Sequence, residues 1–180
     1  MGVLAKDGVY LGQVPRMMNK LFFTLASRVD VAVRCPAEGD FDVAMKWVSG
    51  LGNTVTIAAL SVASSSEQSD ADLESWEPCR PYYLQDLVNV EFNQSDTENV
   101  LVRETIGDEL FVGPNNYLFN LSANEVQQWN LQGSTIHPFH MHVNHMQYSD
   151  VSDPGLLIVP GWNRVGYWID TAVGKSCFAH

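Results

Sequence analysis

The chain has 180 residues, of which 46% are hydrophobic and 17% are charged, so it can build one full core or parts of two and is not a disordered polyelectrolyte. The formal net charge of −11 argues against a nucleic-acid partner. No run of about 18 apolar residues occurs, so no membrane span is predicted. Residues 1–7 become polar too soon for a signal peptide, and none is expected in this chain.

The first part of the chain has a two-residue hydrophobic period. Valines alternate over 29–35, and large apolar side chains alternate with Asp, Ala and Lys over 41–47. Val55 and Ile57 alternate with threonines in a third run. Turn-forming residues bound these runs. The pattern predicts antiparallel strands with one face in water.

An acidic, polar segment then interrupts the period. Residues 61–110 carry twelve of the 21 acidic residues against only Arg80 and Arg103. We interpret residues 63–83 as a solvated acidic linker between a domain over 1–62 and a domain over 84–180. A surface that attracts cations is the alternative interpretation of the same charge.

The period of two resumes after the linker. Strands are predicted over 88–92, 117–121, 126–131, 139–145 and 164–170. No long helical period competes with them. Short strands at this spacing predict an all-β sandwich or barrel.

Four of the five histidines lie within residues 137–145. On a strand, His140 and His142 would project from the same face, about 6.5–7 Å apart along the chain. Such a pair suits one metal ion or two neighbouring ions, and imidazoles with few nearby carboxylates favour copper or zinc. Pro138 bends the chain, so His137 can serve a different site. The alternative is an exposed histidine-rich strand with incidental metal affinity.

His145 and Asp170 are expected to have other roles. His145 would face away from His140 and His142, so we expect a surface or supporting position for it. Asp170 is expected to order a turn or to cap backbone amides, with substrate or proton handling as the alternative.

The segment His137-Pro138-Phe139-His140-Met141-His142 resembles the H-P-x-H-x-H motif of the multicopper oxidases, the laccase-like cupredoxin proteins. Residues 125–131 and 166–171 resemble the strand before that motif and the G-x-W-x-D-T segment of the family's last domain. Residues 6–11 and 26–35 resemble the second half of its middle domain. The resemblance implies a cupredoxin-like Greek-key β-sandwich, with a partial unit over 1–62 and a nearly complete plastocyanin-like unit over 84–180.

The resemblance also implies a function. The chain would be a copper-binding part of an oxidase that oxidises a small reducing substrate at a type 1 copper and reduces dioxygen to water at a trinuclear cluster. Carried over residue by residue, His137 would bind the type 1 copper, His140 the type 2 copper and His142 a type 3 copper. Family habit implies a secreted or extracellular protein.

Several ligands of that family have no counterpart in this sequence. The histidine pairs of the first domain and the H-C-H segment do not occur, so we expect a fragment whose last domain is truncated. Cys177 has no histidine beside it and is not expected to bind type 1 copper. Cys35 and Cys79 could pair in a secreted protein. A non-catalytic copper-binding cupredoxin-like module and a plain structural β-domain are the alternative functions.

Overall fold

The computed structural model describes residues 1–47, 53–64, 73–92, 97–134, 137–152, 159–174 and 176–179. All regular structure in these ranges is β-strand, and they contain no helix, which confirms the all-β prediction. In chain order the strands are β1 (Gly2–Lys6), β2 (Val9–Tyr10), β3 (Arg16–Met17), β4 (Val29–Ala32), β5 (Gly39–Met45), β6 (Val55–Val62), β7 (Thr97–Leu101), β8 (Gln128–Gln132), β9 (Phe139–His140), β10 (Met146–Asp150), β11 (Trp168–Ile169), β12 (Thr171–Ala172) and β13 (Ser176–Ala179).

The contacts divide the chain into two compact units. One unit comprises Met1–Ala32 together with Ser75–His180, and the other comprises Val33–Glu74. The domain boundaries expected from the sequence lie elsewhere, at 62/63 and 83/84, and they stay a prediction.

The first sheet of the larger unit is organised around β1. This strand pairs antiparallel with β2, β3 and β4. Asp7 and Gly8 join β1 to β2 with φ values of 49° and 84°. Two consecutive residues of positive φ match the twist of a tight hairpin, and the Asp-Gly pair adopts them readily. The sequence of the turn therefore sets the register, in which Lys6 lies opposite Val9.

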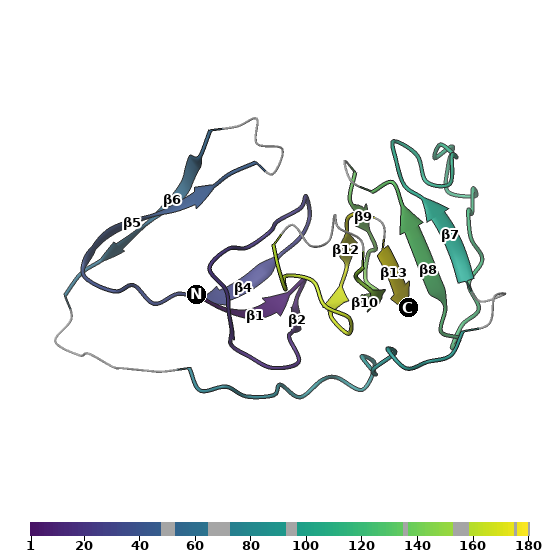
Figure 1. Ribbon diagram of the computed structural model, residues 1–180. Helices are drawn as coiled ribbons and strands as arrows, with labels where there is room; N and C mark the ends of the chain where they lie inside the picture. The colour runs from purple at the N-terminus through teal and green to yellow at the C-terminus, as the bar shows by residue number, and fades with distance from the viewer. Residues whose placement is uncertain are drawn as a thin grey trace. The chain divides into compact units, whose positions relative to one another are not determined.

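The second sheet of the larger unit has the strand order β11-β10-β13-β8-β7. Figure 1 shows β13, β8 and β7 side by side, with β7 parallel to β8 and β13 antiparallel to it. On β8, Trp129 and Leu131 are buried while the residues between and beside them are half-buried or exposed. This alternation is the one expected for 126–131, and the strand is shifted by two residues at its start and one at its end.

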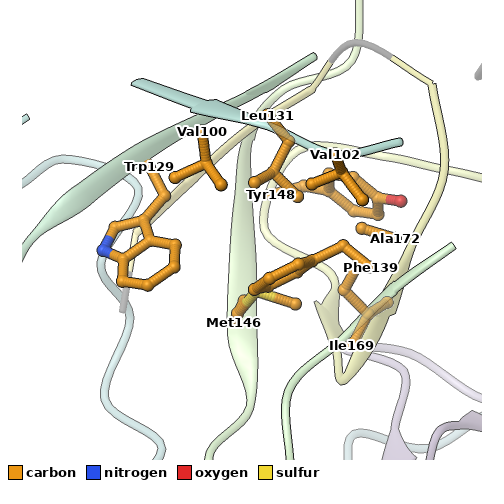
Figure 2. Close-up of a cluster of buried hydrophobic side chains, with 9 residues drawn as sticks. All are labelled: Val100, Val102, Trp129, Leu131, Phe139, Met146, Tyr148, Ile169 and Ala172. Atoms are coloured by element: carbon orange, nitrogen blue, oxygen red, sulfur yellow. The ribbon is translucent and has the colours of Figure 1, made fainter. Parts of the chain in front are cut away.

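Behind this sheet lies the main hydrophobic core. Figure 2 shows its nine buried side chains turned toward one another: Val100, Val102, Trp129, Leu131, Phe139, Met146, Tyr148, Ile169 and Ala172. Met146 is fully buried in this cluster. A second core cluster contains Val3, Leu11, Val14 and Trp162, so residues near the N-terminus pack with residues of the last forty.

The smaller unit contains the hairpin of β5 and β6 (Figure 1). The two strands pair antiparallel, as expected, from Gly39 opposite Val62 to Met45 opposite Val55. Exposed side chains lie on both faces, whereas the sequence led us to expect one buried face.

Two predicted strands do not form, over 88–92 and over 117–121. In the first, the amide of Val88 donates to the Asp86 carboxylate and that of Val90 donates to the carbonyl oxygen of Leu87, so local turns take the place of a ladder. In the second, Phe119 packs on Trp129 with ring centroids 5.3 Å apart, but no strand pairs with its backbone. Alternation without a pairing partner is not sufficient for a strand.

Candidate metal centre

The centre is built where β9 and β12 pair antiparallel, which places His140 opposite Thr171. Phe139 and Met141 turn toward the hydrophobic core on either side of His140. The amide of Met141 donates to the carbonyl oxygen of Asp170 at 2.9 Å, so the pairing continues one residue beyond β9. His140 is therefore held on the outer face, with 28% of its side chain exposed.

The rings of His140 and His142 meet edge to face. Their centroids lie 4.8 Å apart and their planes are inclined by 64°. The sequence predicted that the two residues project from one face of a single strand, but β9 ends at His140 and His142 lies in a bend. The proximity of the two rings therefore does not depend on a continuous strand.

A tight turn at Val143 breaks the strand predicted over 139–145. Val143 has a φ of 71°, and the amide of Asn144 donates to the carbonyl oxygen of His142 at 2.8 Å. This bond between residues two apart defines a γ-turn. Positive φ is unfavourable for a β-branched residue, and the side chain of Val143 is almost fully exposed, so packing does not compensate for it. Strain is thus located directly beside His142.

The Nδ1 atom of His140 lies against three oxygen atoms. They are the carbonyl oxygen of Asp170 at 3.1 Å, Oγ1 of Thr171 at 2.9 Å, and Oδ1 of Asp170 at 3.4 Å. The hydroxyl of Thr171 donates to Oδ1 of Asp170 at 2.8 Å. One nitrogen of the ring is thereby engaged by the protein.

Asp170 also forms an ion pair with Arg28, which lies next to β4. Burial of the Asp170 carboxyl raises its pKa, but the hydrogen bonds from Arg28 and Thr171 more than offset this and hold the pKa below its usual value. The same carboxylate raises the pKa of Arg28 through their hydrogen bond. Asp170 is thus charged at neutral pH.

Asp7 ties this cluster to the first sheet. Its carboxylate accepts hydrogen bonds from the amide of Arg28 at 2.9 Å and from the amide of Asp170 at 3.2 Å. Its carbonyl oxygen lies 2.8 Å from Nε2 of His145. His145 therefore supports the structure through Asp7, in agreement with the supporting role expected for it.

The remaining predicted residues lie apart from this pair. His137 is exposed at a bend before Pro138, and within the part of the chain that the structure describes it has no hydrogen bond or ring contact with His140 or His142. Cys35 and Cys79 are free thiols. The backbone of Cys177 lies in β13, whereas its side chain is outside the described residues.

Sequence reasoning missed Arg28 and Asp7 and gave Asp170 a different role. The Asp170-Thr171 pair was visible as part of the segment that resembles G-x-W-x-D-T, but nothing local pointed to its partners. Arg28 is 142 residues away from Asp170 along the chain. Only the packing of the first sheet on the last strands brings these residues together.

Two observations bear on which ligands the centre can hold. The first is the ring contact itself, which brings the imidazoles of His140 and His142 within 4.8 Å of each other, centroid to centroid. Among the described residues, no group of three or more His, Cys, Asp or Glu side chains is placed to hold a metal. The structure thus brings two imidazoles together without a complete set of metal ligands among the described residues.

Comparisons with protein-family models, with curated proteins and with solved structures found no match to this chain. Within the described ranges, no helix has the length and apolar character needed to cross a membrane.

Proposed function

We propose that this chain is a copper-binding part of a multicopper oxidase, with His140 and His142 as ligands of neighbouring copper ions and His137 as a ligand of a separate copper. The observation that carries the proposal is the approach of the His140 and His142 rings to 4.8 Å. The two residues belong to the segment that resembles the H-P-x-H-x-H motif, and their rings meet although the strand between them is broken.

The environment of His140 suits copper ligation. Metal-binding histidines usually donate their second ring nitrogen to a carbonyl or carboxylate oxygen, and Nδ1 of His140 lies against both kinds of oxygen. Imidazole nitrogen is a ligand that copper prefers. Bound copper would supply one-electron oxidation of a small reducing substrate and reduction of dioxygen.

The fold is compatible with this proposal. An all-β chain with a five-stranded sheet over a buried core supports a cupredoxin-like Greek-key sandwich for the part that contains the histidines. In such a sandwich, successive residues of the segment would face the core and the outside in turn. The core holds Phe139 and Met141, and the alternate residues His140 and His142 are presented outward.

Copper titration of the full 180-residue chain tests the proposal. We expect weak binding of Cu(II), because most ligands of a complete cluster are missing, with nitrogen hyperfine coupling in the electron paramagnetic resonance spectrum. Replacing His140 and His142 together by alanine is expected to weaken binding at least tenfold. His145→Ala is the matched control, because it removes an imidazole of the same segment that bonds to Asp7, and we expect less than a threefold change.

Oxygen uptake separates a part of an oxidase from a complete one. The copper-loaded chain is expected not to reduce dioxygen catalytically, because a trinuclear cluster needs more histidines than this motif contains. Copper binding that survives the double substitution would contradict the assigned ligands. Catalytic oxygen reduction by the chain alone would contradict its role as a part.

A further inference from the structure

The position of the proton on His140 follows from the three oxygens around Nδ1. The carbonyl oxygen of Asp170 can only accept a hydrogen bond. The hydroxyl of Thr171 uses its single proton to donate to Asp170, so its oxygen can only accept from His140. The charged carboxylate of Asp170 is likewise an acceptor. Every partner of Nδ1 therefore requires a proton on that nitrogen.

We propose that Asp170, Thr171 and Arg28 are positioning residues that hold His140 in the Nδ1–H tautomer and so reserve Nε2 as its metal-binding nitrogen. The metal-binding role of Nε2 rests on the proposed function, whereas the tautomer of His140 is a property of the metal-free chain and can be measured without copper. Among the described residues, Nε2 of His140 has no hydrogen-bond partner, so its lone pair is not engaged by the protein.

Arg28 decides the direction of this chain of hydrogen bonds. It donates to both carboxylate oxygens of Asp170, at 3.5 Å to Oδ1 and more closely to Oδ2. These bonds favour the charged carboxylate, which cannot donate to Thr171. The hydroxyl of Thr171 must then donate toward Asp170 and accept from His140. Reversal would require a donor at Oδ1 of Asp170.

Asp170→Asn provides such a donor. Arg28 can only donate, so the amide oxygen of the asparagine would face Arg28 and its NH₂ group would face Thr171. The Thr171 hydroxyl could then turn and donate to Nδ1 of His140, which favours the Nε2–H tautomer. The carbonyl oxygen of residue 170 still favours Nδ1–H, so we expect a mixture of tautomers rather than complete reversal.

Thr171 offers a second variant with a conservative control. Thr171→Val removes the hydroxyl and keeps the shape of the side chain, whereas Thr171→Ser keeps the hydroxyl. The side chain is buried on the short strand β12, so each variant needs a melting curve to show that it folds. The serine variant keeps the hydroxyl and is expected to keep both the wild-type tautomer and the wild-type copper affinity, which separates the role of the hydroxyl from that of the methyl group.

The test is two-bond ¹H–¹⁵N correlation of the imidazole rings in the metal-free chain, recorded at mildly alkaline pH. Wild type and Thr171→Ser are expected to show a protonated Nδ1 and an unprotonated Nε2 for His140. Asp170→Asn is expected to show averaging toward the opposite tautomer. A wild-type His140 with the proton on Nε2, or an Asp170→Asn chain with an unchanged tautomer, would overturn the proposal.

Copper titration of the same variants tests whether the positioning of His140 contributes to copper affinity. Loss of a residue that orients a ligand typically lowers metal affinity about 10–100-fold, and we expect that loss for Asp170→Asn and Thr171→Val but not for Thr171→Ser. If the wild-type chain bound no copper, the proposed function would fail while the nitrogen spectra still decided the tautomer. Unchanged copper affinity in folded Asp170→Asn and Thr171→Val chains would overturn the positioning role and leave the proposed ligands standing.

Discussion

Strand β8 and the hairpin of β5 and β6 have the same kind of sequence pattern, in which apolar and polar residues alternate. In the sheet, the apolar positions are closed off from water: Leu131 is 0% exposed and Val100 is 1% exposed. In the hairpin, Ile57 is 59% exposed and Leu60 is 38% exposed. The alternating residues lie in paired strands in both regions, but only β8 belongs to a sheet with a buried hydrophobic core.

The largest expected difference between these two regions is the effect of truncating a leucine. Leu131→Ala should lower the free energy of unfolding by about 2–5 kcal/mol, because it removes a buried side chain and leaves a cavity. Leu60→Ala should lower it by less than about 1 kcal/mol, because the side chain is already partly in water. Urea unfolding followed by tryptophan fluorescence measures both values. Equal losses would show that a partner covers the hairpin face.

A pH series sharpens the comparison through two lysines. Lys6 is buried on β1, with Nζ 2.8 Å from Oδ1 of Asn163 and 4.5 Å from the ring centroid of Trp162, whereas Lys46 is exposed beyond β5. Burial lowers the pKa of Lys6 from 10.5 to about 7, although Asp7 opposes this and the indole ring favours the charged form. Folding therefore favours the neutral amine.

The sign of the pH dependence follows from that lowered pKa. Between about pH 7 and pH 10.5, the unfolded chain binds more protons at Lys6 than the folded chain. The free energy of unfolding should therefore rise with pH in this window, by at most about 1.4 kcal/mol per pH unit. Below about pH 7, Lys6 is protonated in both states and should contribute no pH dependence. Lys6→Met should remove this slope, while Lys46→Met serves as the control for loss of a lysine. A slope that persists in Lys6→Met would contradict the assignment.

The smallest expected effect concerns two exposed valines. Val143→Gly should raise the free energy of unfolding by about 1 kcal/mol, because glycine adopts the positive φ of the γ-turn without strain. Val55→Gly, in the extended strand β6, should lower it by a similar amount, since glycine is unfavourable in a strand. Thermal melts of the two variants give the opposite signs directly. A loss of stability in Val143→Gly would mean that the turn is not strained.

Much of the local structure could be predicted from the sequence. The period of two identified β4, β5, β6 and β8, and the absence of a helical period agreed with the absence of helices in the described residues. The spacing of His140 and His142 pointed to a pair of imidazoles, and the alternate residues Phe139 and Met141 to a packed inner face. These features depend on side-chain chemistry within a few residues, which a linear pattern records.

The surroundings of the histidine pair were decided only by the tertiary structure. The γ-turn at Val143 ended the predicted strand, and the ion pair of Arg28 with Asp170 joined segments 142 residues apart. Asp7 likewise reached His145 from the first sheet. No local pattern encodes these contacts, because a hydrogen bond across the fold depends on how whole strands pack. The sequence by itself determined that two imidazoles lie two residues apart, at His140 and His142. The pairing of β9 with β12 determined which oxygens surround Nδ1 of His140, and the packing of the first sheet on the last strands brought Arg28 and Asp7 to Asp170.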